Sequence, residues 1–185
     1  MYGILQRRYE QSRTDRQERL MLSFDKMFAR EKGNALWKLH EYWRENASRT
    51  GRTPKIDEFQ YKTKLPASVS RYVSWSDVTA SDPLNYVTHE HTHQTAFRDH
   101  SNRRLGDHPS PMNAKACAME YMHCVRTKQP IYFEIDQKFG AISRNMMRLI
   151  VPLADQSGNI SRLIYAVRII SSSDSDFDSA NSREI

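Results

Sequence analysis

The most specific chemical pattern in the sequence is a run of alternating histidines, His89, His91 and His93. Alternate residues of an extended strand face the same side, so this spacing could bring three imidazoles to one metal ion. No acidic ligand or fourth group is evident at a useful spacing, and the run would lie at a strand end near solvent. A solvated or locally hydrogen-bonded histidine cluster is therefore the alternative to a metal site.

Two cysteines, Cys117 and Cys124, are the next candidates for chemistry. Seven residues of helix separate them by two turns, about 10 Å, which is too far for a disulfide between them. They are either redox-sensitive thiols or small buried apolar residues, because reactivity requires thiolate character and exposure. A ligand pocket between this helix and a sheet would draw on the following side chains, whose alternative role is core packing: Cys117, Tyr121, Cys124, Tyr132, Met147 and Tyr165.

No motif in the sequence encodes a catalytic centre. A nucleophile elbow, a phosphate-binding glycine loop, a Cys-pair zinc pattern and a nucleotide fingerprint are all missing. The six glycines are dispersed singly, and the carboxylates of Asp57 and Glu58 are adjacent rather than convergent. We therefore expect a protein that is not an enzyme. A metal-dependent enzyme that uses the three alternating histidines is an alternative from a different class.

The net charge of +6 arises mainly in the N-terminal part, since residues 1–64 hold 15 Lys and Arg against 9 Asp and Glu. Such a segment can attract acidic partners, anionic lipid or nucleic acid, although a solvated helix face has the same composition. A basic nucleic-acid-associated protein is therefore a second interpretation. Its contacts would come from Arg7, Arg8, Arg13, Arg16 and Arg19.

The N-terminal residues 1–33 are expected to form a basic helical extension. Residues 12–32 contain no Gly or Pro, and Ser12 is a suitable N-cap, which predicts a helix. Apolar residues at positions 20, 24, 27 and 28 form a stripe that could dock on the domain or pair with a second copy. Asn34 then offers a new N-cap, which predicts a second helix that ends before Gly51.

The remaining elements predict an α+β domain over residues 34–170. Short strands are expected at 72–75 and 84–88, a long helix at 111–127 with Ser110 as its N-cap, and three strands at 131–136, 145–153 and 160–170. This order predicts a five-stranded antiparallel sheet with helices on one face. Residues 171–185 are Ser-rich and acidic, and we expect a disordered tail.

No stretch approaches the roughly 18 consecutive apolar residues of a membrane span. Charged residues also interrupt the first 22 positions, which therefore lack the apolar core of a signal peptide. These patterns predict a cytoplasmic protein without membrane contact.

Several short motifs occur in a fixed order at the two ends of the predicted domain. The first group is Leu39-His-Glu-Tyr-Trp43, Arg49, Gly51, Arg52, Pro54, Leu65-Pro66 and Trp75-Ser-Asp-Val78. The second group is Leu149-Ile-Val-Pro-Leu-Ala-Asp155, Gly158 and Arg162-Leu-Ile-Tyr165. Together they resemble the opening and the last hairpin of a bacterial PAS-like family. The resemblance covers about residues 36–170 and implies a PAS-like fold.

This resemblance implies a sensory or adaptor function. PAS domains hold small ligands between sheet and helices, or use the sheet to dimerise and bind kinases. The partner would then be a signalling protein such as a histidine kinase or response regulator, and a homodimer could form through the N-terminal helix. The resemblance also implies that His123, on the long helix, is a candidate axial haem ligand. Haem or another small ligand is a candidate cofactor, and none is required.

Overall fold

The computed structural model describes residues 6–10, 15–90, 101–140 and 142–173. They form one antiparallel sheet of eight strands in the order β1-β2-β6-β7-β8-β3-β4-β5. The strands are β1 (Gln6–Glu10), β2 (Asp15–Leu22), β3 (Val73–Asp77), β4 (Val87–Glu90), β5 (Arg103–Arg104), β6 (Ile131–Phe139), β7 (Ile142–Ala154) and β8 (Ile160–Ser172). The centre of the sheet is therefore built from the last three strands, and β8 returns to lie beside β3.

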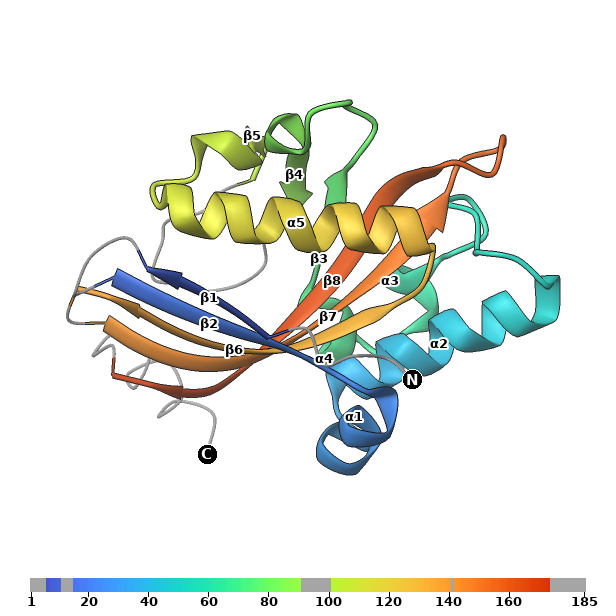
Figure 1. Cartoon of the computed structure of the whole chain (residues 1–185). Coiled ribbons are helices and arrows are strands. Elements are labelled where there is room, and N and C mark those ends of the chain that lie inside the picture. The colour runs from blue at the N-terminus through green and yellow to red at the C-terminus, as the bar shows by residue number, and fades with distance from the viewer. Residues whose placement is uncertain (1–5, 11–14, 91–100, 141, 174–185) are drawn as a thin grey trace.

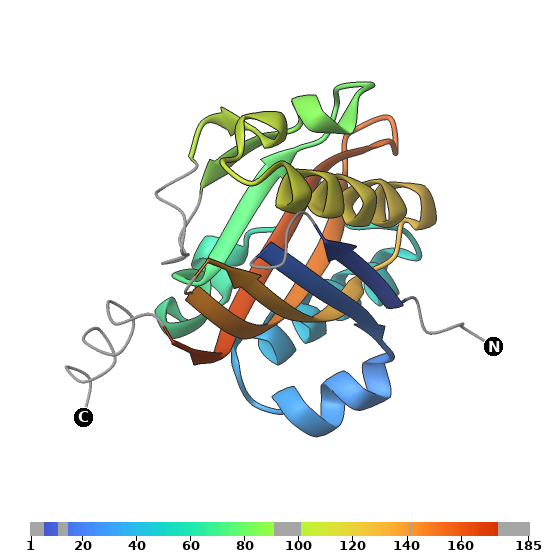
Figure 2. The same cartoon turned by 60° about the vertical axis from the view of Figure 1, so that its left-hand side comes forward.

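Helices cover both faces of this sheet, as Figures 1 and 2 show. The long α5 (Pro111–Thr127) crosses one face. The other face is covered by α1 (Phe24–Glu31) and α2 (Ala35–Thr50), with the short α3 (Tyr61–Lys64) and α4 (Ala67–Ser70) following in the chain. The α+β class is confirmed, but the expectation of five strands with helices on one face only is wrong.

Each central strand supplies one hydrophobic cluster on each side, because successive side chains point to opposite faces. In β6, Ile131, Phe133 and Ile135 pack in the cluster under α5, while Tyr132 packs in the cluster under α1 and α2. The sheet interior is thus buried on both sides. This explains why Leu149, Ile150 and Val151, three consecutive residues of β7, have no exposed surface.

The N-terminal segment requires the largest correction. The sequence predicts a helix over residues 15–22, but these residues form β2 and pair with residues 132–139 of β6, from Asp15 opposite Phe139 to Leu22 opposite Tyr132. The β1 strand pairs with β2 in turn and extends the sheet. Only the last part of the predicted helix is helical, as α1, which begins after the N-cap Ser23.

The predicted helix boundaries elsewhere are confirmed by their caps. The hydroxyl of Ser110 accepts a hydrogen bond from the Asn113 N–H at 3.2 Å, at the start of α5. The side chain of Asn34 caps α2 in the same way. Gly51 ends α2 with a positive φ of 67°, a left-handed conformation that glycine adopts without a Cβ penalty.

The predicted hairpins of the C-terminal half are also confirmed: β6 pairs with β7, and β7 with β8. The strand expected at 84–88 begins later, at Val87, after a 3₁₀ turn over Pro83–Asn85. The expected tail boundary at 171 is slightly early, since β8 continues to Ser172. Residues 174–185 lie outside the described part. None of the described helices has the length and apolar character to cross a membrane.

Candidate functional site

The alternating histidines are only partly described. His89 lies on β4, and its ring stacks on that of Trp75 with a centroid distance of 4.2 Å. His91 and His93 fall outside the described residues. Within the described ranges, no three His, Cys, Asp or Glu residues lie close enough to hold a metal ion together. The metal prediction for this run is therefore untested.

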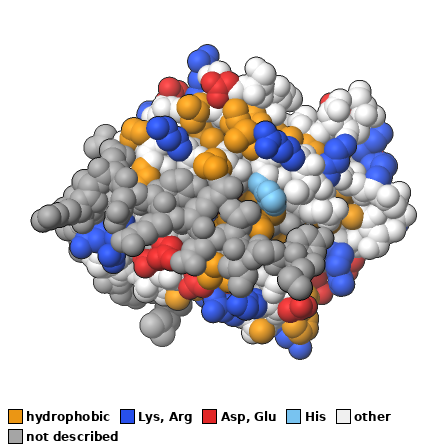
Figure 3. Space-filling model, viewed as in Figure 1, with side chains coloured by type: hydrophobic (Ala, Val, Ile, Leu, Met, Phe, Trp, Pro, Cys, Tyr) orange, Lys and Arg blue, Asp and Glu red, His pale blue; other side chains and the backbone are white. Residues whose placement is uncertain are grey.

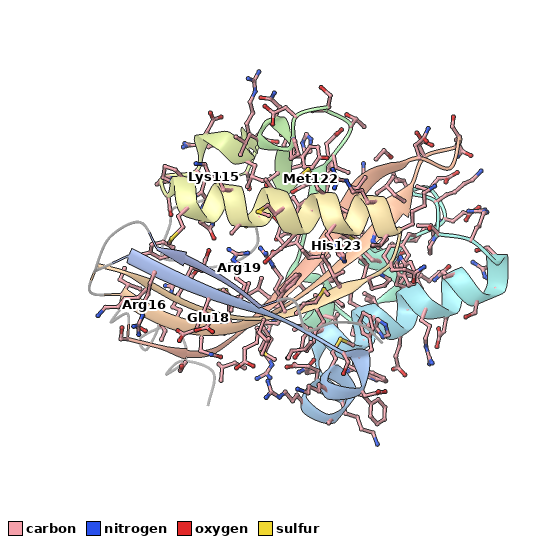
Figure 4. All side chains as sticks on the ribbon, in the orientation of Figure 1. Arg16, Glu18, Arg19, Lys115, Met122 and His123 are labelled. Carbon is pink, nitrogen blue, oxygen red and sulfur yellow. The ribbon has the colours of Figure 1, made fainter. Side chains whose placement is uncertain are left out.

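His123 lies on α5 but does not belong to its fully buried stripe (Figure 4). Its side chain is half-buried, whereas Tyr121 and Cys124 beside it are 3% and 0% exposed. A haem held between α5 and the sheet would need its axial imidazole on that buried stripe. The position of His123 does not fit this role.

The sheet separates the six predicted pocket residues. Cys117, Tyr121, Cys124 and Tyr165 lie in the cluster beneath α5. Tyr132 and Met147 lie in the cluster on the opposite face. These six side chains therefore cannot line one common space, and only the first four lie between α5 and the sheet.

The side of the sheet beneath α5 contains a buried group of charged side chains. Arg19 of β2, Glu120 of α5 and Arg148 of β7 are 2%, 6% and 6% exposed. The Nη1 of Arg19 donates to the Oε1 of Glu120 at 2.7 Å, and the Nη2 of Arg148 forms an ion pair with the other carboxylate oxygen. One carboxylate therefore joins two strands that lie on either side of β6.

The thiol of Cys117 lies between the same two arginines. Its Sγ is 3.3 Å from the Nη1 of Arg148, and 3.8 and 3.7 Å from the Nη1 and Nη2 of Arg19. Cys117 is 5% exposed, so these contacts are formed away from water. We call Arg19, Cys117, Glu120 and Arg148 the Cys117 cluster.

Figure 4 shows how the strand positions its member of the cluster. Arg19 points from β2 toward α5, while Arg16 and Glu18, three residues and one residue earlier, point away from it. The burial follows the same alternation, because Arg16 and Glu18 are exposed and Arg19 is not. The two-residue period of the strand therefore directs Arg19 under the helix.

Neutral polar side chains extend the cluster toward one end of α5. The Nη2 of Arg19 donates to the Oδ1 of Asn113 at 2.6 Å. Gln17, fully buried on β2, donates to the same oxygen at 3.0 Å and to Gln137 of β6 at 2.9 Å. Asn113 also contacts the Nε2 of His108 at 3.0 Å. The arginine is thus fixed in position by hydrogen bonds as well as by its ion pair.

Toward the other end, two tyrosines continue the polar network. The rings of Tyr121 and Tyr165 lie 5.9 Å apart, and the guanidinium of Arg148 lies 6.0 Å from the Tyr121 ring. Ser76 and Thr88, on β3 and β4, share a hydrogen bond of 3.2 Å. Burial raises the pKa of both tyrosines, so their hydroxyl groups remain protonated and can donate.

The charges of the cluster determine the state of the thiol. Burial by itself raises the pKa of Cys117, but the charges and hydrogen bonds of Arg148 and Arg19 outweigh burial and lower this pKa to about 7. Burial lowers the pKa of Arg148. Two guanidiniums face a single carboxylate, and a negative sulfur would balance the remaining positive charge. The arrangement can therefore hold a thiolate.

Cys124, the second cysteine, has a different environment on the same helix. It is fully buried, and its Sγ donates to the carbonyl of Gln129 at 3.3 Å. Burial alone strongly raises the pKa of its thiol. Both cysteines are free in the structure, as their spacing predicted. Cys124 therefore fits the packing role, whereas Cys117 has the thiolate character of a reactive thiol but is also buried.

Sequence reasoning missed the three charged members of the cluster. Arg148 alternates with the apolar Met146 and Ile150, so its inward direction could have been found from the period of β7. The same argument does not find Arg19, because the sequence pattern of residues 15–22 predicts a helix. Glu120 lies three residues after Cys117 and four residues before Cys124, so its helical spacing on the apolar side of this helix was the available signal.

A comparison of the sequence with protein-family models, curated proteins and solved structures finds no match. The fold and the site therefore define the class of this chain by themselves. It is an α+β protein whose antiparallel sheet is covered on both faces and carries a buried thiol between two arginines.

Proposed function

We propose that the chain is a cytoplasmic, non-catalytic sensory or adaptor protein of the PAS-like kind, which receives its signal between α5 and the sheet. The observation that carries this proposal is the order of the five strands β4-β3-β8-β7-β6. In the chain, β3 and β4 come first, α5 follows after the two-residue β5, and β6, β7 and β8 come last, so that the last strand returns beside β3. The PAS resemblance implies this plan.

The contacts between the two groups of motifs support the same proposal. The Nε1 of Trp43 donates to the carbonyl of Pro152 at 2.8 Å. The N–H of Ala154 donates to the carbonyl of Pro54, and the N–H of Ile56 donates to the carbonyl of Ala154, both at 3.0 Å. Motifs about 100 residues apart thus meet on one strand, as parts of one structural unit would.

The polar network under α5 lies where the resemblance implies signal reception. Its groups are buried, which costs free energy unless they are satisfied, and such groups in a helix–sheet interface are typical of functional sites. The opposite face of the sheet is covered by α1 and α2, so a partner would contact other surfaces. Phe28 of α1, 44% exposed, is the part of the predicted apolar stripe still available to a signalling protein or a second copy.

Native mass spectrometry and binding assays test this proposal together. The full chain would be purified without added ligand, weighed under native conditions and scanned for visible absorption. It would then be tested for binding to purified histidine kinases and response regulators of its source organism. A bound small molecule or a saturable partner complex would support the proposal. A bare polypeptide that binds none of these proteins would contradict it.

The alternative of a nucleic-acid-associated protein loses one of its five arginines, because Arg19 is buried in the Cys117 cluster. Figure 3 shows Lys and Arg side chains spread over the visible face and interspersed with acidic and apolar ones. Non-specific nucleic-acid binding depends on a continuous basic surface. Neither observation favours this alternative.

A further inference from the structure

The Cys117 cluster contains more positive than negative charge. Among the described residues it combines two guanidiniums with the single carboxylate of Glu120. The Nε atoms of Arg19 and Arg148 are buried, and neither has a hydrogen-bond partner in the described part of the chain. Burying unbalanced charge is expensive, so a second negative group is expected beside these arginines.

The sulfur of Cys117 is already in the position of that second group. It lies within 3.3 to 3.8 Å of three guanidinium nitrogens, two from Arg19 and one from Arg148. The other titratable groups near it are Glu120 and Tyr121 on its own helix and Tyr165 on β8. The tyrosines remain neutral, so the thiolate would bring the cluster to two positive and two negative charges.

We propose that Cys117 is held as a thiolate by Arg19 and Arg148, and that its oxidation by a small peroxide is the signal that this protein reads. The proposal rests on the sensory function above and names the signal received at the same site. Only the thiolate form of cysteine attacks peroxide, and a nearby cation favours that form.

The chemical step balances as follows. The thiolate sulfur of Cys117 attacks one oxygen of hydrogen peroxide, an S–O bond forms, and the O–O bond breaks. The second oxygen leaves as hydroxide and takes a proton from solvent to give water. The sulfur loses two electrons, which the peroxide gains, and the product is a sulfenic acid.

The surroundings of Cys117 favour this product over a disulfide. The chain has two cysteines, and the other is two helical turns away, about 10 Å. Because Cys117 is only 5% exposed, a bulky thiol has poor access, whereas peroxide is close to water in size. The sulfenic oxygen would remain beside the guanidiniums that held the thiolate.

The structure also shows how oxidation of Cys117 could change the position of other elements of the fold. An added oxygen atom enlarges a close-packed site between α5 and the sheet, which a well-packed interior accommodates by displacing its neighbours. Arg19 is one of those neighbours, and its strand β2 leads through Ser23 directly into α1. Displacement of β2 would therefore move the N-terminal hairpin and α1.

The first test measures the thiolate without any reagent that must reach it. The far-ultraviolet absorbance of the folded chain is titrated with pH and compared with that of the Cys117→Ser variant, so that tyrosine absorbance cancels. The Cys124→Ser variant is the matched control. We expect a thiolate step centred near pH 7 that Cys117→Ser removes and Cys124→Ser keeps. A thiolate absorbance step that appears only at a pH above the usual pKa range of a free cysteine would overturn the proposal.

The second test follows the oxidation. The folded chain is treated with hydrogen peroxide and then unfolded in the presence of a dione that traps sulfenic acid, and both cysteines are followed by peptide mass. We expect Cys117 to be trapped at least about tenfold faster than Cys124, because half of it is thiolate near neutral pH. Equal rates for the two cysteines would overturn the sensing chemistry. Hydrogen exchange of β2 and α1 before and after oxidation then tests the readout separately, so failure of the chemistry and failure of the sensory function are distinguishable.

Discussion

The Nη1 of Arg148 lies 3.3 Å from the Sγ of Cys117, and this contact joins the centre of the sheet to the middle of α5. Arg148 comes from β7, which is buried on both faces, so its position is rigid. Cys117 lies on a helix whose first turn is fixed by the Ser110 cap. Rigid elements on both sides hold the sulfur near the guanidinium, which is the condition for tuning a reactive thiol.

Opposite changes in the charge of the cluster should move the Cys117 titration in opposite directions. Glu120→Gln removes the competing carboxylate, so both arginines face the sulfur alone and the thiolate step should move to lower pH. Arg148→Met removes one cation, and the step should move to higher pH. The measurement is the same far-ultraviolet titration. Shifts in the same direction would indicate a general loss of structure rather than charge control.

The thiolate should also make the stability of the fold depend on pH. The pKa of Cys117 is about 7 in the folded chain and about 9 for an unperturbed thiol. Stabilisation by the thiolate is therefore fully present above pH 9 and is lost as the pH falls through 7. Urea unfolding of the wild type and of Cys117→Ser at several pH values measures it. The difference in unfolding free energy should shrink between pH 9 and 7, and a constant difference would contradict the prediction.

The elements that the sequence predicted correctly are those whose signals are local. Ser110 and Pro111 mark the start of α5, and Asn34 and Gly51 bound α2, because capping depends on neighbouring residues only. The strands β6, β7 and β8 were found from their apolar alternation and intervening turns. The PAS-like identity of the domain stays a prediction.

The β2 strand was missed because its buried face is polar. A strand is found from apolar residues at every second position, but the buried positions 17 and 19 of β2 hold Gln and Arg. Their burial is made tolerable by Asn113, Gln137 and Glu120, which lie far away in the sequence. The Cys117 cluster and the failed strand prediction thus have the same cause, a polar network assembled only by the tertiary fold.

A second buried carboxylate lies on the face of the sheet that is covered by α1 and α2, and we expect it to be important for the stability of the fold. Glu31, at the end of α1, is 0% exposed and accepts hydrogen bonds from the hydroxyl of Tyr132 at 2.9 Å and from Arg168 at 2.8 and 2.7 Å. Burial raises its pKa, but hydrogen bonds from Arg168, Asn34 and Tyr132 outweigh burial and leave the pKa lowered.

Glu31→Gln should therefore destabilise the fold by roughly 2–4 kcal/mol, because it leaves a cation without its buried partner. Glu134→Gln is the matched control, since Glu134 forms an exposed ion pair with Arg30. That change should cost about 1 kcal/mol or less. Chemical denaturation measures both. Similar losses of unfolding free energy for the two variants would argue against a stabilising role for the buried contacts of Glu31 between α1 and the sheet.

The hydrogen bond between Trp43 and Pro152 can be tested in the same assay. Trp43→Phe retains an aromatic ring in the cluster beneath α2 but removes the Nε1 donor and leaves the Pro152 carbonyl without it. We expect a loss of about 1–3 kcal/mol in unfolding free energy. Trp37→Phe, at a partly exposed position of the same helix, should cost less. A larger loss for Trp37→Phe would contradict the role of Trp43 in joining the two groups of motifs.

His40 should contribute a separate acid sensitivity. It is 8% exposed, stacks on Phe24 with a centroid distance of 4.5 Å, and its Nδ1 has no partner among the described residues. Burial, with a smaller effect of the Arg44 charge, lowers its pKa from 6.5 to about 4. The unfolded chain therefore takes up a proton between pH 6.5 and 4 that the folded chain does not, and stability should fall as the pH falls through this window. His40→Phe keeps the stacked ring and removes the titration. Its unfolding free energy should decline less than that of the wild type from pH 6.5 to 4, and parallel declines would show that His40 is not the cause.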